Sequence, residues 1–202
     1  MTRRPLGSRD RILLENARQI VGIDEVGRGC LAGPVVVCGV AFRRIPRNPL
    51  IRDSKRLSPR QRLEAARWIR STCDGWLLTE VWVEVIDRLN ILEATRLAIA
   101  ATARAMVSTE SILVVDHVDP GDVSCPVHAL AGADDRFFSV AAASIVAKVH
   151  RDRIMVDLDR RYPAWSWKNN KGYGTRAHRS ALQRSGPTFL HRKSFGWSPV
   201  LP

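Results

Sequence analysis

The sequence predicts an α/β protein with a central mixed β-sheet and a helical C-terminal end. Short apolar runs bounded by charged or turn-forming residues are typical of buried strands, and longer segments with apolar residues at helical spacing are typical of helices. Strands are expected at 19–24, 33–43, 76–83, 111–116 and 125–130, and helices at 58–69, 86–106, 139–161 and 175–184. Because the strands come early and are interrupted by helices, the helices are expected to flank the sheet.

Capping residues support three of the helices. Ser58 is followed by Pro59 and Gln61, which places an N-cap, a first-turn proline and the third-position partner of a capping box in order. Asp87 is a candidate cap for the helix over 86–106, and Thr175 for the helix over 175–184. Residues 1–18 are Arg-rich without a clear period and are expected to form a loose lead-in.

The chain is strongly basic. It has 202 residues, with 32 Lys and Arg against 20 Asp and Glu, so its net charge is +12. That length is enough for one domain with a sizeable core. A protein this basic favours an anionic partner, and nucleic acid is the first candidate, although a generally solvated basic surface is the alternative.

The four cysteines are scattered at Cys30, Cys38, Cys73 and Cys125, without zinc-finger spacing. Such scattered thiols indicate a reducing compartment. The N-terminus lacks the apolar segment of a signal peptide, and no apolar run is long enough to span a membrane. A cytoplasmic protein without a membrane partner is therefore expected.

Two of the expected buried strands end in carboxylates, at Asp24–Glu25 and at Asp116. Open α/β sheets place their ligands at the carboxyl ends of strands. Converging acids are unfavourable unless a cation lies among them, and hard oxygen ligands suit Mg²⁺ or Mn²⁺. A metal-dependent phosphodiesterase site is one interpretation, and strand-end aspartates that merely cap loops are the other.

Four sequence blocks resemble the type 2 ribonucleases H, and bacterial ribonuclease HII most of all. The first runs from Asp24 to Pro34 (Asp-Glu-Val-Gly-Arg-Gly-Cys-Leu-Ala-Gly-Pro). The others are 53–58 (Asp-Ser-Lys-Arg-Leu-Ser), 141–149 (Ala-Ala-Ala-Ser-Ile-Val-Ala-Lys-Val), and 171–175 (Lys-Gly-Tyr-Gly-Thr) followed by 191–195 (His-Arg-Lys-Ser-Phe). They occur in the family's order, and the match runs from about residue 20 to residue 196, nearly the whole chain.

The resemblance implies a ribonuclease H-like fold. Its catalytic core is expected at 19–162 and a helical C-terminal extension that contributes to substrate binding at 163–202. It also implies an active site of four acids and two divalent ions, Mg²⁺ or Mn²⁺. Asp24, Glu25 and Asp116 match the first three acids. Asp134, ten residues before Ser144, matches the fourth, with Asp135 as the alternative. Asp152 is instead expected to pair with Lys148 or Arg151.

The family's substrate contacts carry over to matching positions. Gly27, Arg28 and Gly29 match the loop that senses the ribose 2′-hydroxyl, although glycines there also suit a tight turn. Tyr173 matches the tyrosine that stacks on the sugar beside the cut. Lys55, Lys148 and Arg192 are candidate phosphate contacts, and Ser144, His191 and Ser194 are weaker candidates for backbone contacts. Trp165 and Trp167 are interpreted as core packing rather than base stacking.

Two positions depart from the family pattern. The third-acid motif continues with His117 where glycine is usual, and the fourth reads Gly132-Ala133-Asp134 without the usual lysine. Neither change removes an acid, so activity is expected.

The implied function is an endoribonuclease that cuts the RNA strand of RNA–DNA hybrids and cuts 5′ of single ribonucleotides in duplex DNA. Such an enzyme would serve ribonucleotide removal. Rival interpretations are a non-catalytic nucleic-acid-binding protein with a decayed site and another nuclease of the same superfold, such as a resolvase. No clamp-binding tail of the Gln-x-x-Leu-x-x-Phe-Phe kind is seen, and a monomer is expected.

Overall fold

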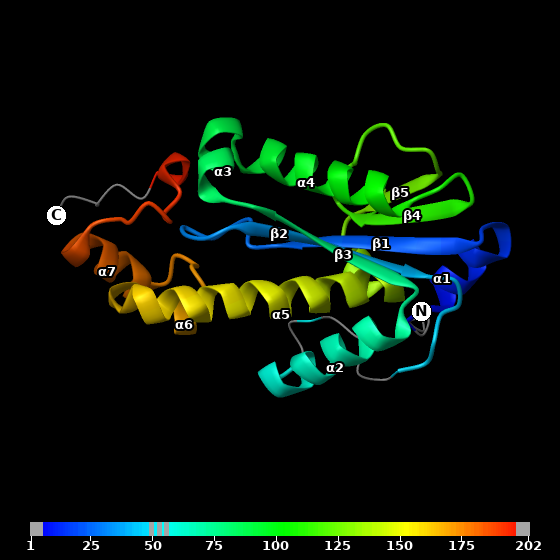
Figure 1. Ribbon diagram of the computed structural model, residues 1–202, viewed down its shortest axis with the longest axis horizontal. Coiled ribbons are helices and arrows are strands. Elements are labelled where there is room, and N and C mark those ends of the chain that lie inside the picture. Colours follow the sequence, from blue (N-terminus) through cyan, green and yellow to red (C-terminus); the bar gives the residue numbers. More distant parts are fainter. Residues whose placement is uncertain (1–5, 49–50, 52–53, 55–56, 197–202) are drawn as a thin grey trace.

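A five-stranded mixed sheet forms the centre of the protein (Figure 1). The computed structural model describes residues 6–48, 51, 54 and 57–196. The strands are β1 (Gln19–Val26), β2 (Val35–Phe42), β3 (Gly75–Val81), β4 (Ser111–Asp116) and β5 (Val127–Leu130), in the order β3-β2-β1-β4-β5. The first three strands pair antiparallel, whereas β4 is parallel to both β1 and β5. The predicted mixed sheet is confirmed.

Helices cover both faces of this sheet. The long helix α5 lies along one face with α2 outside it, and α3 and α4 cover the other face (Figure 1). The helices are α1 (Ser8–Leu13), α2 (Pro59–Thr72), α3 (Val83–Leu89), α4 (Ile91–Met106), α5 (Phe138–Arg161), α6 (Trp167–Asn170) and α7 (Arg176–Ser185). Short 3₁₀ turns are η1 (Leu14–Asn16), η3 (Ala133–Asp135), η4 (Pro163–Trp165) and η5 (Lys193–Phe195). No helix in the described part of the chain is long and apolar enough to cross a membrane.

The caps predicted for α2 and α7 are confirmed. Ser58 and Gln61 form a reciprocal capping box, and Thr175 accepts the backbone N–H of His178. The prediction of a single helix over 86–106 is wrong. Asn90, at φ 71°, breaks it into α3 and α4 and caps α4 through its side chain. Asp87 lies within α3 and instead accepts hydrogen bonds from Lys193 and Ser194.

Residues 8–16, expected to be part of a loose lead-in, form α1 and η1. This segment is held in part by a long-range contact of Asp10, which is fully buried. Its carboxylate accepts the backbone N–H groups of Phe138 (2.8 Å) and Ser139 (2.9 Å) and the Ser139 hydroxyl (2.7 Å). These groups open α5, where the first amides lack helical partners and the helix dipole favours a negative charge. The N-terminal segment therefore caps the longest helix.

Small residues let α5 approach the sheet closely. Its first turns contain Ala141, Ala142 and Ala143, all fully buried. Opposite them, a Cβ on Gly22 of β1 would lie 2.2 Å from the backbone carbon of Ser139. Only glycine fits such a contact, so the pair brings Ser144 of α5 over the end of β1.

The C-terminal elements pack through Trp165 and Trp167, as the sequence predicts. Trp167 is fully buried and stacks on Trp165 with ring centroids 5.7 Å apart. Their cluster includes Met155 of α5, Ala32 and Leu190. Core packing rather than base stacking is thus confirmed for Trp167.

We predict that Asp10→Ala destabilises the protein by about 2 kcal/mol, because it leaves two buried amides and a hydroxyl without their acceptor. Urea unfolding followed by circular dichroism measures the change. Glu15→Ala is the control, since Glu15 is exposed on the same segment. Equal midpoints for Asp10→Ala and Glu15→Ala would show that the N-terminal segment does not stabilise α5.

Candidate active site

The parallel pairing of β1 and β4 brings the first acids together. Ile23 is opposite Val115 in the register, so Asp24 and Asp116, the next residue of each strand, lie side by side. The fourth predicted acid arrives through η3, because the Ala133 N–H donates to Asp116 Oδ1 at 2.9 Å. Acids from three separate segments therefore meet at the carboxyl ends of β1 and β4.

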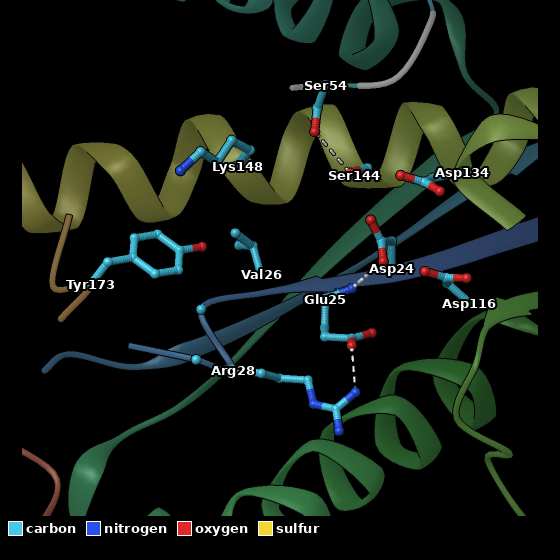
Figure 2. Close-up of a pocket in the computed structure, with 12 residues that line it drawn as sticks. Asp24, Glu25, Val26, Arg28, Ser54, Asp116, Asp134, Ser144, Lys148 and Tyr173 are labelled. Atoms are coloured by element: carbon cyan, nitrogen blue, oxygen red, sulfur yellow. Dashed lines mark hydrogen bonds and ion pairs between the residues drawn. The ribbon is translucent and has the colours of Figure 1, made fainter. Parts of the chain in front are cut away.

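These acids line a cavity of about 500 Å³ (Figure 2). Its wall also includes most of the residues that the sequence predicts for substrate binding. The lining residues are Asp24, Glu25, Val26, Gly27, Arg28, Gly29, Ser54, Asp116, Asp134, Ser144, Lys148 and Tyr173. Figure 2 shows the carboxylates of Asp24, Asp116 and Asp134 near one another and Tyr173 further along α5.

Asp24 lies deepest in this group, with 6% of its surface exposed. Burial raises its pKa well above the usual value, and the charges of Glu25, Asp116 and Asp134 raise it further. A hydrogen bond from the Ser144 side chain opposes this shift. The cavity is therefore a place where negative charge is costly unless a cation compensates it.

Glu25 is held at one oxygen and unsatisfied at the other. Arg28 donates to Glu25 Oε1 at 3.1 Å, whereas Oε2 is buried and has no hydrogen-bond partner in the described structure. Burial raises the pKa of Glu25, and the contact with Arg28 lowers it. A buried, unpartnered carboxylate oxygen facing other acids fits a cation ligand.

Within the described ranges, no three His, Cys, Asp or Glu side chains form a group that could hold an ion unaided. Mg²⁺ is commonly held by one or two carboxylates, with water and substrate phosphates completing its coordination. The carboxylates around the cavity and the unpartnered oxygen of Glu25 fit that mode of binding.

The structure distinguishes the two candidates for the fourth acid. Asp134 lines the cavity and its charge acts on Asp24. Asp135 is exposed and is not among the lining residues. The geometry favours Asp134.

The loop after β1 forms the floor beside the acids. Gly27 has φ 97°, and a Cβ there would lie 2.2 Å from the Arg151 Nε. Glycine is thus required both by the backbone and by the guanidinium packed behind it. Arg28 and Gly29 also line the cavity, so all three predicted ribose-reading residues share the acids' cavity.

Tyr173 and Lys148 border the far end of the cavity. The Lys148 ammonium lies 5.7 Å from the Tyr173 ring centroid and donates to Asp152 at 2.8 Å. The predicted pairing of Asp152 with Lys148 is therefore confirmed. Lys55, the other predicted phosphate contact, lies outside the described residues.

His191 and Arg192 lie behind the cavity. Both are fully buried, and neither is among the lining residues. Arg192 donates to the carbonyls of Gly33 and Arg28, and burial lowers its pKa to about 10. The two residues therefore contact the loop that follows β1 and do not reach the cavity. The Ser194 hydroxyl donates a hydrogen bond to Asp87.

Sequence reasoning did not select Ser54, which lines the cavity, or Arg151, which supports the cavity's glycine loop from behind. Ser54 lines the cavity, and its hydroxyl lies 3.1 Å from that of Ser144. Its place within the second sequence block was the available signal. Arg151 donates to the carbonyls of Pro34, Ala32 and Lys171. An arginine near the middle of a helix gives no such signal, since most are solvated.

His117 adopts φ 63°, a left-handed conformation that glycine adopts more readily. It is exposed and does not line the cavity. The glycine usual at this position thus has a backbone explanation, and the histidine side chain does not crowd the acids.

Known proteins share both the sequence and the fold. A family model described as ribonuclease HII matches residues 21–197. A ribonuclease HII from Paramagnetospirillum magneticum is 47% identical over 180 residues, which is 87% of this chain and 89% of that protein.

Solved structures agree with these sequence matches. The crystal structure of ribonuclease H2 from Pyrococcus horikoshii aligns with a TM-score of 0.75 and 24% identity, over 89% of this chain and 94% of that one. The ribonuclease HII in a PCNA complex from Archaeoglobus fulgidus aligns with a TM-score of 0.71 and 28% identity, over 86% and 92% of the two chains. The predicted ribonuclease H-like fold is confirmed. The chain belongs to the ribonuclease HII family and is a hydrolase of the ribonuclease H class, whose substrates are RNA–DNA hybrids.

Proposed function

We propose that this protein cuts the RNA strand of hybrids and cuts 5′ of single ribonucleotides embedded in duplex DNA, using two divalent cations. One observation carries the proposal. The same cavity contains the four carboxylates and the Gly27–Gly29 loop with Tyr173, so a cutting site and a ribose-reading site are adjacent. The removal of ribonucleotides from DNA, during replication or repair, is the corresponding role.

The four acids would hold the cations. Asp24 is the most buried, and the charges of the other three act on it, so it would be a central ligand of the bound ions. Glu25, Asp116 and Asp134 complete the ligand set. Two bound ions, Mg²⁺ or Mn²⁺, would supply activation of the attacking water and stabilisation of the leaving oxygen. Because water attacks, the products carry 3′-hydroxyl and 5′-phosphate ends.

The protein's own groups select and orient the substrate. Backbone groups of Gly27 to Gly29 can approach the sugar edge closely, and a 2′-hydroxyl there distinguishes RNA from DNA. The half-exposed Tyr173 ring is available for stacking on the next sugar. Lys148 adds positive charge beside the cavity, where a phosphate of the strand would lie.

The rival interpretations receive less support. A decayed, purely binding site would have lost an acid, yet all four predicted acids are present and three of them surround Asp24. A resolvase-like nuclease would lack the adjoining glycine loop and tyrosine. Preference for a ribose-containing substrate separates that last alternative from the proposal.

The primary test is gel-resolved cleavage of a DNA duplex that carries one ribonucleotide. We expect one cut on the 5′ side of the ribose with Mg²⁺ or Mn²⁺, and none with chelator. An all-DNA duplex is the control and should stay intact. Binding without cleavage in either metal would reject the enzymatic proposal in favour of a binding protein.

Substitution of the acids tests their roles one by one. Asp24→Asn and Asp116→Asn should each reduce cleavage by more than about 100-fold, the loss that an outer-shell partner of a metal site already produces. Hybrid binding, measured by fluorescence anisotropy, should persist. Asp134→Asn should behave likewise, and its neighbour Asp135→Asn should remain active. Loss of cleavage in Asp135→Asn, with cleavage retained in Asp134→Asn, would assign the fourth ligand to Asp135.

We also predict that Asp24→Asn stabilises the metal-free protein, by about 1 kcal/mol or more. Burial and neighbouring acids raise the pKa of Asp24 above 3.8, so ionised Asp24 opposes folding. This penalty is absent below the ordinary pKa of aspartate and complete above the raised pKa. Urea unfolding in chelator should therefore show the gain at pH 8 and show it shrinking towards pH 4. A variant less stable than wild type at pH 8 would contradict the repulsion.

A further inference from the structure

A buried aromatic group lies beneath Tyr173, outside the cavity. Trp167, His178 and His191 are all fully buried, and none lines the cavity. The rings of His178 and His191 have centroids 5.3 Å apart, and Trp167 lies 5.3 Å from His191. Two adjacent imidazoles in such a place need their hydrogen bonds satisfied by each other and by the protein.

Groups that can only donate a hydrogen fix the tautomers of both rings. The Thr188 backbone N–H donates to His191 Nδ1 at 2.9 Å, so His191 must carry its hydrogen on Nε2. The Trp167 indole N–H donates to His178 Nε2 at 3.1 Å, so His178 must carry its hydrogen on Nδ1.

These assignments produce a directed chain of hydrogen bonds that ends on Tyr173. His191 Nε2–H faces His178 Nε2 at 3.2 Å and shares that acceptor with Trp167. His178 Nδ1–H then donates to the Tyr173 carbonyl at 2.9 Å. A second proton on either ring would oppose an N–H donor.

The pKa values of the two rings agree with a neutral pair. Burial, with a smaller contribution from the neighbouring His178, lowers the pKa of His191 to about 4. Burial likewise lowers the pKa of His178, with a smaller contribution in the same direction from Arg179.

The same segments hold residues 30–32, which directly follow the ribose-reading loop, from both sides. An isolated antiparallel β-bridge pairs the backbone of Cys30 with that of Tyr173, and another pairs Ala32 with His191. The Leu31 N–H donates to the Gly172 carbonyl at 2.8 Å. The Leu31 carbonyl accepts a hydrogen bond from the Arg192 backbone N–H at 2.8 Å. The imidazole pair thus links the two backbone segments, around Tyr173 and around His191, between which residues 30–32 lie.

We propose that His178 and His191 are positioning residues that set Tyr173 against the Gly27–Gly29 loop, and so determine how strictly a ribose is required at the cut. The proposal rests on the proposed function, in which Tyr173 and this loop contact the sugar. It assigns His191 an indirect role in place of the direct substrate contact that the sequence suggested.

The tautomers are tested first, on the unmodified protein, by ¹⁵N NMR of the imidazole nitrogens at pH 7. We expect a neutral Nδ1–H ring for His178 and a neutral Nε2–H ring for His191. Loss of each signal in the corresponding Asn variant assigns it. An Nε2–H tautomer for His178, or a charged ring at either position, would overturn the chain of hydrogen bonds whether or not the protein cleaves.

A matched pair of variants then tests the function of the chain. His178→Asn can keep a donor near the Nδ1 position, towards Tyr173, whereas His178→Gln can keep an acceptor near the Nε2 position, towards Trp167 and His191. We expect His178→Gln to lower kcat on the single-ribonucleotide duplex about tenfold more than His178→Asn, because small misplacements near a site reduce rates strongly. Thermal unfolding of both variants identifies any loss that is due to stability.

A double-mutant cycle with Tyr173→Ala separates positioning from general support. If His178 acts through the Tyr173 ring, the Gln substitution should have no further effect on kcat once that ring is absent. The same loss in the Tyr173→Ala background, or equal losses for Asn and Gln in the wild-type background, would overturn the positioning role. A wild-type protein that fails to cleave would reject the proposed function, while the NMR result still decides the hydrogen-bond chain.

Discussion

The parallel pairing of β1 with β4 is the constraint on which the site depends. It delivers Asp24 and Asp116 to the same edge of the sheet, and η3 adds Asp134 through its bond to Asp116. Placing these charges together is unfavourable in the metal-free protein. The surrounding structure must therefore hold them there. The close packing of α5 on Gly22 does so from above and brings the Ser144 hydroxyl onto Asp24.

A second set of contacts holds the loop that follows β1. Arg151 from α5 and Arg192 from the C-terminal segment both point their guanidinium groups at its main-chain carbonyls. Each guanidinium has five donors in a rigid plane, so one side chain fixes several carbonyls at once. Burying these groups is costly, and the lowered pKa of Arg192 reflects that cost. These hydrogen bonds give the loop a defined shape, which the proposed contact of its backbone with a sugar would require.

Much of this arrangement was predictable from the sequence, and the exceptions have physical reasons. The strands, two helix caps and the acids Asp24, Glu25 and Asp116 follow from local patterns, because strand burial and capping are short-range effects. Asp134 was predicted only through the resemblance to the family. The break at Asn90 was missed because Asn at positive φ looks the same in sequence as any helical Asn. The order in residues 8–16 was missed because Asp10 meets its partners 128 residues away. Arg151 and the indirect position of Arg192 were missed for the same reason: their partners are backbone atoms of distant segments, which leave no residue signature.

The two halves of the proposed activity depend on the chain in different ways. The acids come from β1, β4 and η3, which belong to the sheet and its immediate connections. The sugar-reading surface instead needs three segments in register: the loop after β1, the segment around Tyr173, and the segment around His191. Two of these three lie in the C-terminal part that supplies none of the four acids. A disturbance there, at α7 or in the buried tryptophan and histidine group, would therefore alter which sugar is accepted while leaving the carboxylates in place. Under the proposed function, discrimination between ribose and deoxyribose would thus depend on how the C-terminal part docks onto the sheet rather than on the acids themselves.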